Sequence, residues 1–338
     1  MTRAFSWFAI VLAMGVVVAC GDDDGMTADT GMGEDAGETA DAGTDTGEPP
    51  RDAGTDTGPP CEPDPDAPCP PRCMRPEREV GDRVDGLGHL VAVDLTLSCA
   101  FDWTLPDQTY VAPGATLTVE PGVWVEAASR GALVVQRGAR LEAVGTAELP
   151  ITFDGPTRGS WSGVFLLGAA PILGVTSDRP DDYQGDERDL EIFAAGRMGF
   201  GGEDAAHDCG TLRYVRIRHA GRANRIALPV NVHPLLLAGC GTDTEVDFVH
   251  VHRANHDGLG VYGGEVTLEH LVVTEVPVGQ AYSLDFGWAG RRQYWIGHNT
   301  SDNDQSGIAG RRRPPPLGPP PVPNVTLLSP PRTDPAPI

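Results

Sequence analysis

The sequence of 338 residues contains no lysine, and all 25 of its basic residues are arginine. Schiff-base catalysis and lysine general bases are therefore excluded. Aromatic residues make up only 6% of the chain, and no basic stripe with interleaved aromatic side chains appears, so we expect no nucleic-acid partner. The chain also lacks a G-x-S-x-G motif and a glycine-rich phosphate loop ahead of a helical pattern, which argues against Ser-His-Asp catalysis and phosphate-loop chemistry.

Long apolar runs are missing except at the start of the chain. Arg3 precedes an apolar stretch at residues 5–18, which is shorter than the ~20 residues that a bilayer requires. This arrangement is typical of a secretory signal, which we assign to residues 1–19. The stretch ends in Val17-Val18-Ala19-Cys20, which resembles a lipobox, so Cys20 is the expected lipidation site. Ordinary cleavage that leaves Cys20 as a free thiol is the alternative.

Residues 20–79 offer almost nothing that can build a hydrophobic core. Residues 21–79 contain 17 acidic residues and four arginines, and residues 41–47 are repeated at 52–58. Such a composition predicts a disordered acidic tether with a reach of about 40 Å. Gly21 follows Cys20, whereas an aspartate there is associated with inner-membrane retention. We therefore expect the lipid to hold the chain on the outer membrane, facing the periplasm or the cell surface.

Cysteine usage points to an oxidising compartment. Seven cysteines less the lipidated one leave six, an even number, for which disulfides are the expected state. The spacing does not fix how Cys61, Cys69, Cys73 and Cys99 pair. A zinc site at Cys69 and Cys73 is the alternative, but no histidine lies nearby in the sequence.

From about residue 80 to 310, short runs of valine, leucine and isoleucine alternate with turn residues. Residues 116–127 resemble 132–143 at an offset of 16, and the strand-like segments 212–220, 246–254 and 268–276 share one template at offsets of 34 and 22. Repeated templates at such spacing predict an all-β solenoid in which each coil covers its neighbour. A β-sandwich explains the alternation but not the repeats.

Several segments together resemble a family of exported Gram-negative proteins, most of them uncharacterised, that fold as right-handed parallel β-helices. The segments are 115–122, 148–153, 161–172, 209–217, 257–266 and 268–274. The resemblance implies a fold and an extracytoplasmic location, but no shared activity. At the other end, residues 311–338 combine a proline-rich insertion with one more strand at 323–328, which we expect to be frayed.

Cys209 and Cys240 each stand just before one of the repeated strands. Equivalent positions in successive coils are ~4.8 Å apart, which is within the range of a disulfide. We therefore expect a Cys209–Cys240 bridge.

Acidic residues are the candidates for polysaccharide lyase or hydrolase chemistry, which needs paired carboxylates or a calcium site. Asp257 and Asp285 are the main catalytic candidates, with Glu265, Glu203 and Asp204 as further acids. The alternative is that Asp257 and Asp285 accept hydrogen bonds from turn N–H groups. We expect no cofactor apart from calcium in the enzymatic case.

Histidines form the candidate metal site. His250 and His252 project from one face of a strand, and His256 follows four residues later, with ligand types that suit zinc or copper. Arg216 and Arg218 occupy the template positions of His250 and His252 in the preceding repeat. This correspondence favours solvated outward side chains instead.

Aromatic residues near the C-terminus form the candidate binding surface. Tyr282, Trp288 and Trp295 lie near Arg291 in the sequence, a composition that suits stacking on a sugar ring beside a cation. Closure of the solenoid core is the other role open to these rings, and it is the one that we favour. As a whole, the sequence favours a membrane-anchored, non-enzymatic lipoprotein with a glycan or protein ligand; the alternative is a carbohydrate-active enzyme that uses Asp257 and Asp285.

Overall fold

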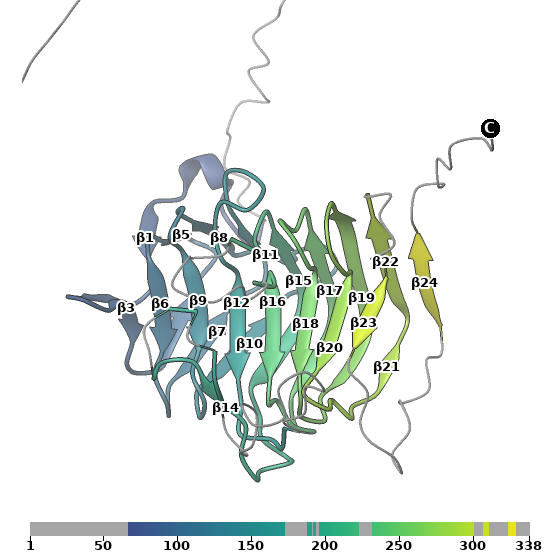
Figure 1. Ribbon diagram of the computed structural model, residues 1–338. Coiled ribbons are helices and arrows are strands. Elements are labelled where there is room, and N and C mark those ends of the chain that lie inside the picture. The colour runs from purple at the N-terminus through teal and green to yellow at the C-terminus, as the bar shows by residue number, and fades with distance from the viewer. Residues whose placement is uncertain are drawn as a thin grey trace, which may run out of the picture. The chain divides into compact units, whose positions relative to one another are not determined.

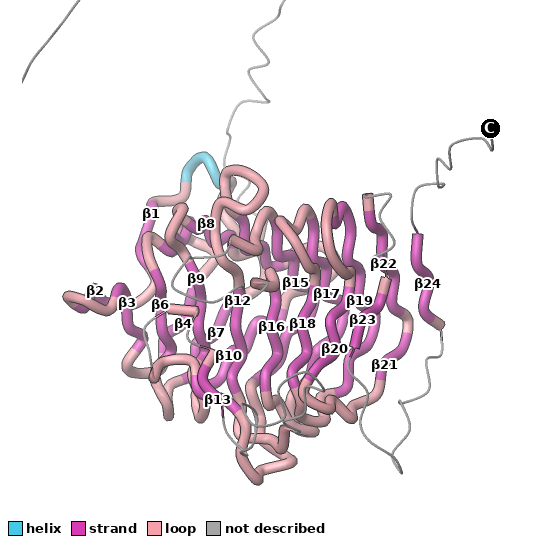
Figure 2. Tube along the Cα trace, in the orientation of Figure 1, coloured by secondary structure: helices cyan, strands magenta, loops and turns pink. Residues whose placement is uncertain are grey.

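The computed structural model describes residues 67–172, 188–190, 192–193, 196–222, 232–300, 307–310 and 324–328. In these segments the chain is a right-handed parallel β-helix, with strands stacked coil upon coil (Figure 1). The only helix among them is the 3-10 turn η1 (Arg72–Met74), drawn in cyan in Figure 2. No helix in the described segments has the length and apolarity needed to cross a membrane.

One wall of the β-helix is a nine-stranded sheet, here called sheet B. Its strands, in sheet order, are β2 (Asp82–Val84), β3 (Gly88–Val91), β6 (Gln108–Val111), β9 (Ala132–Val135), β12 (Val164–Leu167), β16 (Leu235–Ala238), β18 (Leu259–Tyr262), β20 (Tyr282–Asp285) and β23 (Ile308–Gly310). Only the terminal β2–β3 pair is antiparallel. The strands β9, β12, β16 and β18 are buried along their whole length, which is typical of a parallel sheet covered on both faces.

The other wall is a 13-stranded sheet, here called sheet A, which bends into two limbs. The first limb holds β4 (Leu95–Leu97), β7 (Thr116–Val119), β10 (Arg140–Val144) and β21 (Arg292–Gln293). The second holds β1 (Glu77–Glu79), β5 (Asp102–Leu105), β8 (Trp124–Ala127), β11 (Ile151–Asp154), β22 (Trp295–Asn299) and β24 (Val325–Leu328). Three long strands cross both limbs: β15 (Gly210–Arg218), β17 (Glu245–His252) and β19 (Thr267–Val276). A separate antiparallel pair joins β13 (Arg188–Asp189) to β14 (Gly199–Phe200).

The bend of sheet A is made by one left-handed residue in each coil. Tyr214, Phe248, His270 and Tyr294 have φ values of 52°, 51°, 47° and 60°, a conformation that is uncommon outside glycine. Their rings stack on one another with centroid separations of 4.6, 4.4 and 4.8 Å in that order. We call these four residues the corner ladder.

The register of the strands confirms the longer repeat and corrects the shorter one. Arg216 pairs with His250 and Arg218 with His252, as the shared template predicted. By contrast, β7 does not stack on β9, because Thr116 pairs with Arg140, an advance of 24 residues per coil. The 16-residue offset therefore compares β7 with a strand of the other sheet, and β8 with β10 on the other limb of sheet A.

The core fills the space between the two sheets with rows of apolar side chains. One such row runs through five consecutive coils and consists of the buried residues Val119, Ala143, Leu212, Val246 and Leu268. Because neighbouring strands are ~4.8 Å apart, each side chain in a row packs on the next. A second apolar cluster covers the outer face of sheet B and includes Phe165, Phe193 and Phe200.

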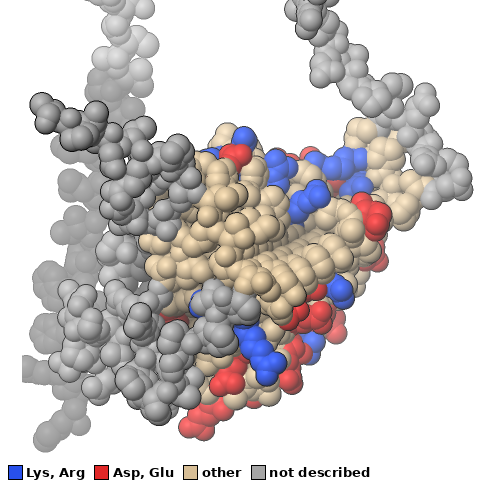
Figure 3. Space-filling model, turned by 90° about the vertical axis from the view of Figure 1, so that its right-hand side faces the viewer, with Lys and Arg blue, Asp and Glu red and all other residues tan. Residues whose placement is uncertain are grey.

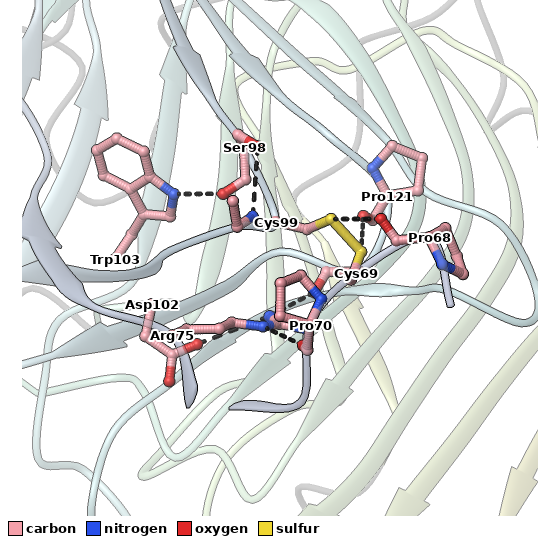
Figure 4. Close-up of a disulfide and its surroundings, with 11 residues drawn as sticks. Pro68, Cys69, Pro70, Arg75, Ser98, Cys99, Asp102, Trp103 and Pro121 are labelled. Atoms are coloured by element: carbon pink, nitrogen blue, oxygen red, sulfur yellow. Dashed lines mark hydrogen bonds and ion pairs between the residues drawn. A yellow bond between two sulfur atoms is a disulfide. The ribbon is translucent and has the colours of Figure 1, made fainter. Parts of the chain in front are cut away.

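The first coil begins earlier than residue 80. Strand β1 pairs in parallel with β5, so residues 77–79, assigned to the tether from composition, belong to the β-helix. A disulfide joins Cys69 to Cys99 with their Cα atoms 5.6 Å apart (Figure 4). Cys73 is also disulfide-bonded, so the alternative of a zinc site at Cys69 and Cys73 is wrong. Cys20 and Cys61 lie outside the described residues.

The expected bridge between Cys209 and Cys240 is present, with Cα atoms 5.7 Å apart. It ties the start of β15 to the coil that follows.

At the C-terminal end, β24 is not frayed within its described residues. Its four residues pair in parallel with β22, from Val325 opposite Trp295 to Leu328 opposite His298. The end view in Figure 3 shows an uncharged central surface with charged side chains at its margin. Ile296, Leu327 and Leu328 are exposed at this end by 42%, 45% and 52%. The proline run at 314–322 lies outside the described residues.

Candidate functional site

The two acids singled out from the sequence flank adjacent strands of sheet B, at opposite ends. Asp285 ends β20 and stands opposite Tyr262 at the end of β18, while Asp257 precedes β18 by two residues. Between them lies His233, from the segment that leads into β16. Its ring lies over Gly260, where an added Cβ would overlap it. The absence of a side chain at residue 260 therefore makes the space that the imidazole fills.

His233 is buried, with 1% of its surface exposed. Its Nε2 lies 3.0 Å from the Tyr262 hydroxyl, and its Nδ1 has no hydrogen-bond partner among the described residues. Burial lowers the pKa of His233, and the neighbouring charges of Asp257 and Asp285 oppose this shift. The imidazole is therefore neutral near pH 7, beside two carboxylates.

Hydrogen bonds fix both carboxylates in place. Asp257 is 4% exposed; its Oδ1 accepts the Gln280 N–H at 2.8 Å and lies 3.1 Å from Nδ1 of His256. Asp285 accepts the Ser283 hydroxyl at 3.2 Å. Gln280, which donates this hydrogen bond to Asp257, belongs to the next coil, so the carboxylate connects two coils.

Aromatic rings cover this group of residues. Phe286 lies 5.0 Å from Tyr262 and 5.7 Å from Phe200, measured between ring centroids. Phe200 and Tyr262 belong to the apolar cluster on the outer face of sheet B. In the described residues, His233 therefore lies against this apolar layer, hydrogen-bonded to the hydroxyl of Tyr262.

The other acids lie apart from this group. Asp204 accepts the Ala206 N–H at 3.2 Å in an exposed turn, and Glu203 beside it is also exposed. Glu265 follows β18 on the connection to β19 and is half-buried.

The predicted histidine triad is divided between strand β17, which holds His250 and His252, and the turn before β18, which holds His256. His250 Nε2 and His252 Nδ1 lie 2.8 and 2.9 Å from the same hydroxyl, that of Thr274 on β19. His256 instead contacts Asp257, so the three-histidine metal site is wrong. Burial, together with the charges of His252 and Arg216, lowers the pKa of His250 to about 4.

The predicted aromatic binding surface is also wrong for its three rings. Tyr282 and Trp295 are fully buried and Trp288 is 6% exposed. The Tyr282–Trp295 and Trp288–Trp295 ring centroids lie 4.5 and 6.0 Å apart inside the β-helix. Arg291 alone is exposed. These rings close the core, as the favoured interpretation of the sequence predicted.

Sequence reasoning missed His233, Tyr262 and the corner ladder. The ladder had a visible signal, because Tyr214, Phe248 and His270 all occupy the third position of the repeated template. His233 had none, since it belongs to a connection between strands and not to a repeat.

Comparison with curated proteins and with solved structures finds no match for the chain. A family model described as a pectate-lyase-like β-helix domain matches residues 88–331. This range begins at β3 and ends after β24, so it covers nearly all the coils described above. The chain therefore belongs to the family of pectate-lyase-like β-helix domains.

Proposed function

We propose that the chain is an extracytoplasmic lipoprotein, held by an acylated Cys20 on the outer membrane, whose β-helix is a rigid, non-enzymatic binding scaffold. The burial of Asp257 and of the neighbouring His233 carries the second part of this proposal. Asp257 is 4% exposed and His233 1%, whereas a polysaccharide must reach both acids of a hydrolase. The hydrogen bonds that join Asp257 to Gln280 and His233 to Tyr262 connect neighbouring coils, which is a structural role.

Two features support the extracytoplasmic location. The disulfides Cys69–Cys99 and Cys209–Cys240 are bonds that persist in oxidising compartments. The signal-like residues 1–19 and the acidic tether precede the β-helix in the sequence. Digestion of intact cells with an added protease tests which side of the membrane the domain faces: cleavage indicates the cell surface, and full protection the periplasm.

The outer face of sheet A is the surface we propose for the glycan or protein ligand. It displays the corner ladder, with Tyr294 45% exposed, next to the paired rows of Arg216 with His250 and Arg218 with His252. Rings beside cationic and neutral polar groups suit both sugars and protein side chains. Because the rows are held by the backbone ladder, the surface is rigid before a ligand arrives.

A carbohydrate-active enzyme is the second candidate. The juxtaposition of a neutral histidine, a tyrosine hydroxyl and two carboxylates favours it, as does the family description. In this case Asp257 and Asp285 carry the acid–base work, and the aromatic cover must open to admit substrate.

Assays against acidic and neutral polysaccharides, with and without calcium, separate the two candidates. The scaffold predicts binding without turnover. Turnover that is abolished in Asp257→Ala, but retained in a control with the exposed Asp85→Ala, would establish the enzyme and contradict the scaffold.

A further inference from the structure

Beside the corner ladder, one group combines the imidazole of His270 with two carboxylates on the outer face of sheet A. Asp247 on β17 and Glu269 on β19 are direct neighbours across the parallel ladder, and His270 follows Glu269. Ligand atoms of these three side chains all lie within 4.8 Å of one another, and all three residues are half-buried. From this geometry we infer a binding site for a zinc-class divalent cation.

The negative charges of the two neighbouring carboxylates are only partly balanced by nearby cationic groups. Arg213, the preceding residue in the same row, lies 3.8 Å from Asp247, and the following residue in the row is the neutral Gln293. Within the described residues, the side chain of Glu269 makes no hydrogen bond or ion pair. Like charges on adjacent strands destabilise a sheet, and a bound cation removes that cost.

His270 is oriented for this role by the corner ladder. Its ring lies between those of Phe248 and Tyr294, with interplanar angles of 1° and 15°. Both ring faces are thus occupied, and Nδ1 points to Asp247, whose Oδ1 is 2.8 Å away. A ligand ring held in this way loses little rotational freedom when it binds a metal.

The surroundings attract cations and leave room for further ligands. Asp247 and Glu269 line a hollow of about 410 Å³ together with Asp243, Glu245 and three threonines. Small rotations of the partly exposed carboxylates bring all three ligand atoms to about 2 Å from one ion. One imidazole and two carboxylates suit Zn²⁺, whereas Ca²⁺ needs six to eight oxygens. The inference depends only on this geometry and stands apart from the proposed function.

Titration calorimetry of the full chain, freed of metal with a chelator, tests the site with Zn²⁺ and Ca²⁺. We expect one Zn²⁺ per chain and weaker Ca²⁺ binding. His270→Phe keeps an aromatic ring in the ladder but removes the nitrogen, and it is expected to weaken Zn²⁺ binding at least about tenfold. Glu269→Gln should do the same, and circular dichroism checks that each variant is folded.

Matched variants separate coordination from general attraction of cations. Glu245→Gln removes one charge from the same hollow without touching a ligand, so it should change the Zn²⁺ affinity less than about threefold. Arg213→Gln should tighten binding, because it removes a cation beside Asp247. Absence of Zn²⁺ binding in the wild type overturns the inference. The inference is also overturned if Glu245→Gln weakens Zn²⁺ binding as much as Glu269→Gln does. It is overturned equally if a His250→Gln/His252→Gln variant loses Zn²⁺ binding while His270→Phe retains it.

Discussion

Buried aromatic residues near the C-terminus hold neighbouring coils together through hydrogen bonds to backbone carbonyl groups. The Tyr282 hydroxyl donates to the Ile296 carbonyl at 2.7 Å. The indole N–H groups of Trp288 and Trp295 donate to the carbonyls of Val266 and Leu268 at 3.0 and 3.1 Å. Since burial of a polar group is costly without a partner, each of these bonds fixes the orientation of its ring in the core.

Replacement of Tyr282 by phenylalanine tests the structural role of this ring. Loss of the hydroxyl leaves a buried carbonyl with one partner fewer, so Tyr282→Phe should lower the free energy of unfolding by about 1–3 kcal/mol. Tyr294→Phe is the control. Because Tyr294 is 45% exposed, this substitution should change the free energy of unfolding by less than about 0.5 kcal/mol. Equal effects in a denaturant titration would contradict the assignment of Tyr282 to the core.

The pKa of His250 predicts a loss of stability in acid. Burial lowers this pKa from 6.5 to about 4, so between these values the unfolded chain binds a proton that the folded chain does not. Its contribution is therefore present above pH 6.5 and declines as the pH falls towards 4. In His250→Gln, the free energy of unfolding should fall less steeply over this range than in the wild type. An unchanged slope, relative to a His298→Gln control, would show that His250 titrates normally.

At the scale of elements, close backbone contact between coils depends on glycine at a few turns. Gly264 follows β18 with φ +72°. Its N–H donates to the Pro171 carbonyl at 2.9 Å, and its own carbonyl accepts the Ala289 N–H at 3.0 Å. A Cβ at this position would overlap the Cys240 carbonyl oxygen. Three separate segments therefore pack together around one residue without a side chain.

A pair of alanine substitutions separates this contact from the cost of positive φ. Gly86 has φ +77° with no atom within 4 Å of an added Cβ, so Gly86→Ala should cost about 1 kcal/mol of stability. Gly264→Ala has the same penalty for positive φ, and its Cβ must also displace a neighbouring coil. It should therefore lower the stability by roughly 1–3 kcal/mol more than Gly86→Ala. Thermal unfolding of the two variants measures the difference. Similar losses would mean that the coils at residue 264 move apart easily.

The sequence predicts the stacking of elements better than the contacts between their connections. The shared template places Arg216 opposite His250 because equivalent residues of successive coils occupy the same rung. The offset of 16 residues failed since strands of sheets A and B alternate in a similar apolar pattern. The pattern alone does not say to which wall a strand belongs.

The candidate site was predicted only in part, for a related reason. Asp257 and Asp285 flank strands of adjacent coils, but the register places them at opposite ends of these strands. His233 belongs to a connection outside the repeat. Its local sequence gives no sign that its ring fills the space over Gly260. For Tyr282 and Trp295, composition fits both a sugar platform and a core, and only the packing decides.

At the scale of the whole molecule, the two ends of the β-helix differ. Near the N-terminal end, the segment that carries η1 is tied to the strands by Cys69–Cys99. Arg75 reinforces this attachment, since its side chain donates to the Pro70 carbonyl at 2.8 Å and lies 3.6 Å from Asp102. The C-terminal end exposes the apolar side chains of β24. This asymmetry matches a scaffold whose N-terminal end is joined to an anchor.

Mass spectrometry of the mature protein isolated from membranes tests the central claim of lipid anchorage most directly. We predict that the mature chain starts at Cys20 and carries a diacylglyceryl group on its sulfur, and that Cys20→Ala is neither processed there nor acylated. A mature chain that starts at another residue, or that carries an unmodified Cys20, would contradict the account.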